Sequence, residues 1–158
     1  MGLLTFKGGI HPNDGKSLAK DQPIKEVIPT GKMIYPLSQH IGAPATAIVA
    51  KGDAVLKGQK IAEAGGFVSA PIYSSVSGKV LALEKHLNPT GNSVDCIVIE
   101  NDGEYNEVEY SCSKALGELS KEEILNKIGE AGIVGMGGAG FPTRVKLSPK
   151  EPDKIEYI

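Results

Sequence analysis

A glycine-rich run near the end of the chain contains the residues whose types and spacing could do chemistry. Residues 132–143 read GIVGMGGAGFPT. Glycines at this density let backbone N–H groups approach a bulky ligand, because no Cβ stands in the way and a positive φ costs little. We expect Pro142 to begin a short helix that ends near Leu147, and the free N–H groups of a helix start suit a phosphate. Lys146 follows about one turn later, where its ammonium group could reach the same phosphate.

The spacing alone leaves two interpretations open. The loop could bind an anion, or it could only let a helix pack closely on a strand. The run matches neither the G-x-G-x-x-G pattern of an ordinary Rossmann unit nor a Walker A loop with its terminal Gly-Lys-Ser/Thr. Its order Gly-x-Gly-Gly-Ala-Gly-Phe-Pro-Thr resembles the FMN- and NADH-binding loop of the flavin subunit of respiratory complex I and its relatives.

A capping box predicts the helix that leads into this loop. The Ser120 hydroxyl can accept the amide hydrogen of Glu123, while the Glu123 carboxylate can accept that of Ser120. The helix should run for about three turns and end at Gly129 or Gly132. Its apolar face comprises Ile124, Leu125 and Ile128.

From Ala47 to Glu100 the sequence predicts short β-strands with frequent turns. The turn signals are Lys51–Asp53, Lys57–Gln59, Ser77-Gly78 and Asn88–Gly91. The strands between them include Val68–Ile72, Lys79–Glu84 and Val94–Glu100. We expect Asp53 to cap its turn through its side chain. This pattern favours a small closed or sandwich-like β structure. Its expected core is Val55, Leu56, Ile61, Val80, Leu81, Leu83, Ile97 and Ile99.

The flanking regions indicate the domain organisation. Residues 1–40 are broken by glycines and prolines and predict an extended arm, with brief strands at Lys25–Ile28 and Met33–Leu37 that pair with the β body. The β domain then covers residues 41–103, and a charged connector covers 104–119. Residues 120–158 begin a second domain, which we expect to be incomplete because Lys154–Ile158 predicts a strand that stops in mid-run.

Composition excludes several function classes. Lys and Arg total 17 against 19 Asp and Glu, a formal charge of -2, so neither nucleic acid nor an anionic membrane is a favoured partner. No segment approaches the ~20 apolar residues of a membrane span. Cys96 and Cys112 lack metal-binding spacing, and Cys96 lies in an apolar run that predicts a buried side chain. The residues of this chain therefore predict no metal site.

The three histidines are dispersed in loops. None is spaced as a ligand pair, so we expect local turn or packing roles for His11, His40 and His86. Gln39 and His40 could instead contact a neighbouring protein of a larger assembly.

The turns Gly52-Asp53 and Gly58-Gln59, followed by Ala70-Pro71 and Ser77–Val80, resemble the biotinyl and lipoyl carrier modules. Those modules are barrel-sandwich hybrids with an acceptor lysine in the hairpin between their halves. Residues 64–69 of this chain read AGGFVS and contain no lysine. The resemblance therefore implies the fold as a scaffold without the swinging-arm chemistry.

Several motifs in the same order resemble one family across essentially the whole chain. They are Phe6–Pro12, Pro36–Pro44, the two Gly turns, Ser69–Pro71, Ser77–Val80 and the glycine loop. The chain is identified as a member of the RnfC family, the C subunits of Rnf electron-transport complexes. The implied fold is mainly β: a barrel-sandwich hybrid followed by the truncated start of an α/β FMN/NADH-binding domain like that of the complex I flavin subunit.

The resemblance implies a function for the intact protein. It would exchange electrons with NAD(H) through FMN and pass them through [4Fe-4S] clusters to the B subunit and ferredoxin, coupled to ion translocation by membrane subunits. It would be a peripheral subunit on the cytoplasmic face of the cell membrane. Cluster-binding cysteines would lie beyond residue 158, and we expect these 158 residues alone to be inactive and to bind FMN weakly or not at all.

The same resemblance implies the site residues. The expected FMN and NADH contacts are Gly135, Gly137, Gly138, Ala139, Gly140 and Phe141, with Lys146 reaching the flavin phosphate. Two positions depart from the complex I pattern: Met136 replaces an arginine and Arg144 replaces a glycine. The alternatives are a related soluble flavin and iron–sulfur reductase, such as a cobalamin reductase or a proline reductase electron carrier, and a non-catalytic scaffold module.

Overall fold

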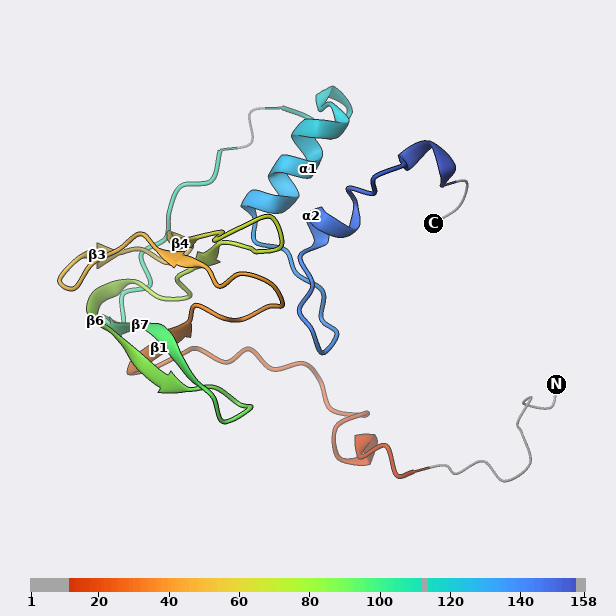
Figure 1. Cartoon of the computed structure of the whole chain (residues 1–158). Helices are drawn as coiled ribbons and strands as arrows, with labels where there is room; N and C mark the ends of the chain where they lie inside the picture. The colour runs from red at the N-terminus through yellow and green to blue at the C-terminus, as the bar shows by residue number, and fades with distance from the viewer. Residues whose placement is uncertain (1–11, 112–113, 156–158) are drawn as a thin grey trace.

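The structure is a computed structural model that describes residues 12–111 and 114–155. Its β part comprises two antiparallel sheets (Figure 1). In order across the larger sheet lie β1 (Lys32–Pro36), β7 (Ser93–Asn101), β6 (Gly78–Leu87) and β3 (Ala54–Val55). In order across the smaller sheet lie β2 (Thr46–Ala47), β4 (Lys60–Glu63) and β5 (Ile72–Tyr73). The mainly β, sandwich-like architecture is therefore confirmed.

One apolar core joins the two sheets. Ile61 on β4 and both Ile97 and Ile99 on β7 are 0% exposed. Removing a side chain of this size from water stabilises the folded state by about 1.5–3 kcal/mol. Of the expected core, Leu81 is half-buried, whereas Leu56 and Leu83 are 40% and 46% exposed. Those two assignments are wrong, because apolar type alone does not say which side of a strand or turn faces the partner sheet.

The β6–β7 hairpin is the longest paired segment, and its turn falls where the sequence predicted it. The Asn88 side-chain oxygen accepts hydrogen bonds from the Thr90 and Asn92 amides at 3.1 and 2.9 Å. Gly91 has φ +81°, a conformation that favours glycine. This turn is thus fixed by its own residues.

The arm contributes one strand to the sheets. β1 pairs with β7, from Lys32 opposite Glu100 to Pro36 opposite Cys96, as expected for the second brief strand. The first is wrong: residues 23–30 contain no strand. Pro23 and Pro29 flank that segment, and Ile24 and Val27 lie exposed. Of the expected strand Val68–Ile72, only the end forms part of β5.

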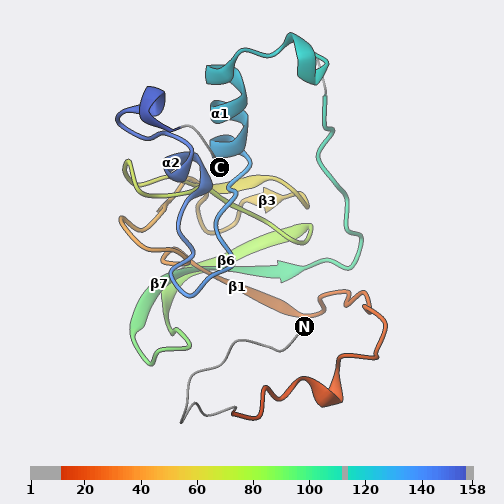
Figure 2. The same cartoon turned by 90° about the vertical axis from the view of Figure 1, so that its right-hand side faces the viewer.

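Helices follow the β part. α1 (Lys121–Glu130) begins with the predicted capping box: the Glu123 amide donates to Ser120 Oγ at 3.2 Å, and the Ser120 amide donates to Glu123 Oε2 at 2.8 Å. α2 (Thr143–Lys146) lies beside α1 over the β sheets (Figures 1 and 2). The short 3₁₀ turns are η1 (Lys16–Leu18), η2 (Leu116–Glu118) and η3 (Pro152–Lys154).

The strand expected at residues 154–158 does not begin at Lys154 or Ile155. Lys154 belongs to η3, and residues 156–158 lie outside the described residues. The motif Phe6–Pro12 lies almost wholly outside them as well.

Candidate functional site

The glycine loop is a closed turn between Val134 and Pro142. These two residues form an antiparallel bridge. The Gly135 amide donates to the Phe141 carbonyl at 2.8 Å, and the Gly140 amide donates to the Gly137 carbonyl at 3.1 Å. The loop therefore has a defined shape built from its own backbone.

The glycines of the loop fall into two groups. Gly140 has φ +55°, and a Cβ there would lie 3.1 Å from the Gln39 carbonyl oxygen. A Cβ at Gly135 would lie 2.5 Å from Lys146 Nζ. At Gly137 and Gly138 a Cβ would meet nothing within 4 Å, and neither φ is in the left-handed range. The backbone thus favours glycine at Gly140, whereas a Cβ at Gly135 would only require the Lys146 ammonium group to move. The described residues provide no reason for glycine at Gly137 and Gly138.

Several backbone amides of the loop are free. Within the described part of the chain, no hydrogen bond from them to another residue is present. They belong to Met136, Gly137, Gly138, Ala139 and Phe141. Neighbouring free N–H groups in a loop can bind an anionic oxygen.

Lys146 lies against the root of the loop. α2 carries its ammonium group close to Gly135, so the lysine and the loop come together as the sequence suggested. The helix does not begin at Pro142 as expected, however, but at Thr143. Pro142 precedes the helix in an extended conformation, with φ -58° and ψ 125°, and α2 has only 4 residues. So short a helix has little dipole, and any anion binding here depends on the loop amides and Lys146.

Residues 39–41, which follow β1, hold the glycine loop against the β domain. The Ile41 amide donates to the Ala139 carbonyl at 2.9 Å. His40 is fixed in turn, because its Nε2 accepts the Ala70 amide at 3.0 Å and its Nδ1 lies 3.1 Å from the Ile41 carbonyl. Sequence reasoning predicted a local role for His40 or a contact with another protein, and it missed this link to the loop, for which no local signal exists.

An open groove of about 770 Å³ lies beside the loop tip. Gly138 and Ala139 form one side of it. The other sides come from β1, from residues 38–41 and from the β6–β7 turn at residues 88–90. Among the described residues, no Asp, Glu, Lys or Arg lines it. A smaller hollow of about 290 Å³, between His40, Tyr73 and Val134, shares His40 with this groove.

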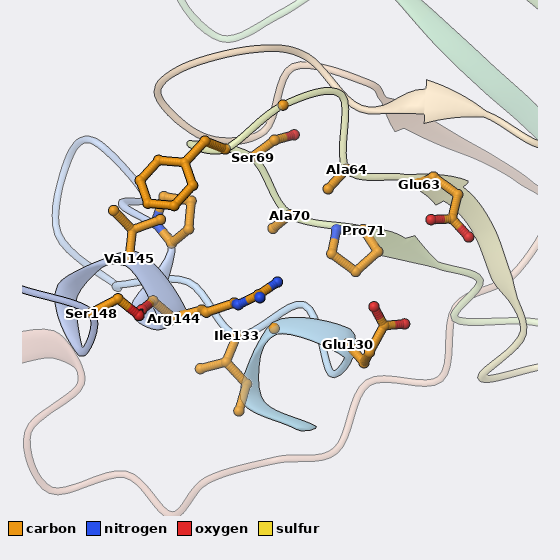
Figure 3. Close-up of a pocket in the computed structure, with 14 residues that line it drawn as sticks. Glu63, Ala64, Ser69, Ala70, Pro71, Glu130, Ile133, Arg144, Val145 and Ser148 are labelled. Atoms are coloured by element: carbon orange, nitrogen blue, oxygen red, sulfur yellow. The ribbon is translucent and has the colours of Figure 1, made fainter. Parts of the chain in front are cut away.

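A separate cavity of about 170 Å³ lies between the 64–71 segment and the two α-helices (Figure 3). The Arg144 side chain crosses this cavity between Pro71 and Ile133. Its stem packs on Gly129, where a Cβ would lie 2.6 Å from Arg144 Cδ. The guanidinium group thus lies at the C-terminal turn of α1, where a cation is favoured by the helix dipole.

Polar contacts join α1 to the smaller sheet. Lys60 Nζ lies 2.5 Å from Glu130 Oε2, and the Tyr73 hydroxyl donates to the Glu130 carbonyl. The hydrogen bond with Glu130 raises the pKa of Lys60 above its ordinary value. Burial raises the pKa of the Tyr73 hydroxyl. These contacts fix the helix from which the glycine loop departs.

The remaining residues singled out in the sequence have structural roles or lie outside the described residues. Asp53 caps its turn as expected, with Oδ2 accepting the Ala50 amide at 2.8 Å. Cys96 is buried, also as expected. The expectation that His86 lies in a loop is wrong: it lies in β6, where its Nε2 is 2.9 Å from Glu84 Oε1. His11 and Cys112 fall among the residues not described.

Neither a metal cluster nor a membrane-spanning helix is present in residues 12–111 and 114–155. These ranges contain no group of three or more His, Cys, Asp or Glu side chains placed to bind a metal ion. None of the helices in the same ranges is both long and apolar enough to cross a membrane.

Similarity to known proteins extends over both parts of the chain. Residues 4–104 match the model of the RnfC barrel-sandwich hybrid domain. The chain is 46% identical over 157 residues to the C subunit of the proton-translocating ferredoxin:NAD(+) oxidoreductase complex of Clostridium ljungdahlii. It is 42% identical over 156 residues to the Na(+)-translocating counterpart of Acetobacterium woodii. It is 36% identical over 159 residues to the C subunit of the ion-translocating oxidoreductase complex of Haemophilus influenzae strain PittEE.

These matches cover 99%, 98% and 99% of this chain, respectively. The chain spans 34%, 35% and 24% of the length of the same three relatives. The matched domain is the β part described above, and the similarity continues through the glycine loop. The chain therefore belongs to the RnfC family, and its two β sheets are the barrel-sandwich hybrid domain of that family.

Proposed function

We propose that the protein acts as the C subunit of an ion-translocating ferredoxin:NAD(+) oxidoreductase complex. In this role it exchanges electrons with NAD(H) through FMN and passes them through [4Fe-4S] clusters toward or from ferredoxin. Family membership supports the proposal, as do the names of relatives that align over almost the whole chain. Its partners are the B subunit and the membrane subunits, and its place is the cytoplasmic face of the membrane.

The observation that carries the proposal is the unexplained pair Gly137 and Gly138. Open space surrounds both positions, so packing within the described residues does not account for the absence of side chains. The amides of the same residues have no acceptor in that part of the chain. A ligand whose phosphate lies against the backbone accounts for both facts, because a Cβ would hold it away from the N–H groups.

The residues present fit a flavin nucleotide. The free amides of Gly137, Gly138 and Ala139 can donate to phosphate or ring oxygens, and Lys146 adds a positive charge at the root of the loop. Phe141, the aromatic residue next to Gly140, is half-buried. When bound, FMN supplies the conversion of a two-electron hydride transfer into single-electron steps, while the protein supplies binding and orientation.

We assign no ligand of the proposed [4Fe-4S] clusters to these 158 residues. Cys96 lies in the β core, which leaves it unavailable as a ligand without unfolding β7. The proposal therefore places the [4Fe-4S] ligands in the part of the protein that corresponds to the remaining length of the relatives.

The test is a pair of substitutions in the full-length protein. Gly138→Val should raise the dissociation constant of FMN about tenfold or more, the equivalent of about 1.4 kcal/mol. Gly117→Val is the matched control, because Gly117 also has open space and no left-handed φ but lies in η2. Fluorescence titration of FMN measures the affinity. Absence of FMN binding by the unmodified full-length protein would refute the proposal, as would equal effects of the two substitutions.

A further inference from the structure

The groove beside the glycine loop is bordered mostly by the β domain. Ile34 and Pro36 come from β1, Ile41 from the segment that anchors the loop, and Pro89 from the β6–β7 turn. The loop contributes Gly138 and Ala139. In Figures 1 and 2 the loop and the turn project toward the same side of the sheets. The groove is therefore a shared feature of both parts of the chain.

We infer that the β domain supplies one wall of the nucleotide site, and that the flat ring system of the flavin lies in this groove. The inference rests on the proposed function and extends it to residues that neither the motif nor the family comparison assigns. In this arrangement the loop amides face the nucleotide from one side, and the apolar side chains of β1 and the turn face it from the other.

The chemistry of the lining favours a flat, largely apolar group. The aliphatic side chains Ile34 and Ile41, together with Pro36 and Pro89, are exposed or half-buried there. The described residues place no Asp, Glu, Lys or Arg side chain in the lining, so a ring that gains and loses electrons meets no fixed charge from them. Burial of apolar ring surface supplies the affinity, while the polar end of the nucleotide is left to the free amides.

Size separates the groove from the other hollows. At about 770 Å³ it falls within the ~300–1,000 Å³ of ligand pockets, whereas the cavities at Arg144 and behind His40 are about 170 and 290 Å³. The cavity at Arg144 also contains Glu63 and Glu130, two carboxylates against the single guanidinium group of Arg144, so its lining has no net positive charge for an anionic nucleotide.

The walls are fixed in position before any ligand arrives. The turn at residues 88–92 is closed by three hydrogen bonds to Asn88 Oδ1. The glycine loop, which forms the other wall, is tied to the β domain by the hydrogen bond from the Ile41 amide to the Ala139 carbonyl. A preformed site loses less conformational entropy on binding.

The test uses the full-length protein and compares Ile34→Asp with Ile48→Asp. Ile34 lies in the groove and is 45% exposed, whereas Ile48 is 51% exposed and lines none of the three hollows described. FMN binding is measured by fluorescence titration, and the shape of the visible absorption band reports the polarity around the bound ring. We expect Ile34→Asp to weaken FMN binding about tenfold or more and to broaden the absorption band. Ile48→Asp should change the dissociation constant of FMN by less than about twofold.

The outcomes separate the inference from the proposed function. Loss of binding in Gly138→Val with unchanged binding and spectrum in Ile34→Asp would overturn the inference and leave the proposed function intact. Absence of FMN binding in the unmodified protein would refute both. If Ile34→Asp lowers the unfolding midpoint without changing the affinity, another part of the protein covers the groove and the inference is wrong. Pro89→Asp, on the exposed β6–β7 turn, repeats the test at a second position of the β-domain wall should Ile34→Asp fail to fold.

Discussion

Replacing His40 by alanine tests whether the β domain holds the glycine loop. The substitution removes the acceptor of the Ala70 amide, which His40 Nε2 now binds at 3.0 Å. Ala70 is 4% exposed, so its N–H group cannot readily turn to water. An unsatisfied buried donor costs about 1–3 kcal/mol, and we expect the free energy of unfolding to fall by that amount.

The assay is urea unfolding of the 158-residue chain, with His86→Ala as the control. His86 pairs with Glu84 on the exposed part of the β6–β7 hairpin, and such surface pairs contribute about 0.2–1 kcal/mol. His40→Gln should recover part of the loss, because its side-chain oxygen can accept a hydrogen bond. Hydrogen exchange at the Ile41 amide, which donates to Ala139, should accelerate in His40→Ala. Equal stabilities of His40→Ala and His86→Ala, with unchanged exchange at Ile41, would refute the proposed anchoring.

Three further predictions concern Gly140, the hydrogen bond between Ser77 and Asp102, and FMN binding by residues 1–158. Gly140→Ala should lower the free energy of unfolding by about 1–2 kcal/mol, because φ is +55° and the new Cβ would crowd the Gln39 carbonyl; chemical denaturation checks this, and an unchanged stability would contradict it. The Ser77 hydroxyl hydrogen bond holds the pKa of Asp102 below its ordinary value, so the ionised carboxylate stabilises the fold above the unfolded-state pKa of about 4, and this contribution is lost as the pH falls through the folded-state pKa. In Ser77→Ala the Asp102 pKa, followed by NMR titration, should rise toward the ordinary value, and a pKa that stays low would show that the backbone amides suffice. Residues 1–158 alone should bind FMN at least about tenfold more weakly than the full-length protein, and tight stoichiometric binding would disprove the expectation that a second part completes the site.

Features set by neighbouring residues could be predicted from the sequence. The Ser120–Glu123 capping box and the Asp53 turn depend on side chains that bond within three positions, so the residue types are sufficient to identify them. The β6–β7 turn belongs to the same class. The alternation of turns and apolar pairs likewise indicated a mainly β domain, which the two sheets confirm.

Features set by distant contacts could not be predicted. Nothing near His40 in the sequence indicates that it binds Ala70 or that its neighbour Ile41 binds the glycine loop. Leu56 and Leu83 have the same residue type as core positions, and only the packing of one sheet against the other shows that they are exposed. Even the glycine motif does not separate the glycines that the fold requires from those it does not.

The segment that corresponds to the lysine hairpin of a carrier module is held close to the β domain by its backbone. In a carrier the hairpin between the two halves must project a modified lysine freely. Here the Gly65 amide donates to Ser69 Oγ at 2.9 Å, a Cβ at Gly65 would overlap the Pro44 carbonyl oxygen, and the Phe67 side chain is 79% exposed. A Cβ at Gly66 would lie 3.2 Å from the Ala43 side chain. A side chain at Gly65 would have to displace the backbone that leads from the loop anchor into β2, so this glycine lets residues 64–69 pack against that backbone where a carrier has a mobile arm.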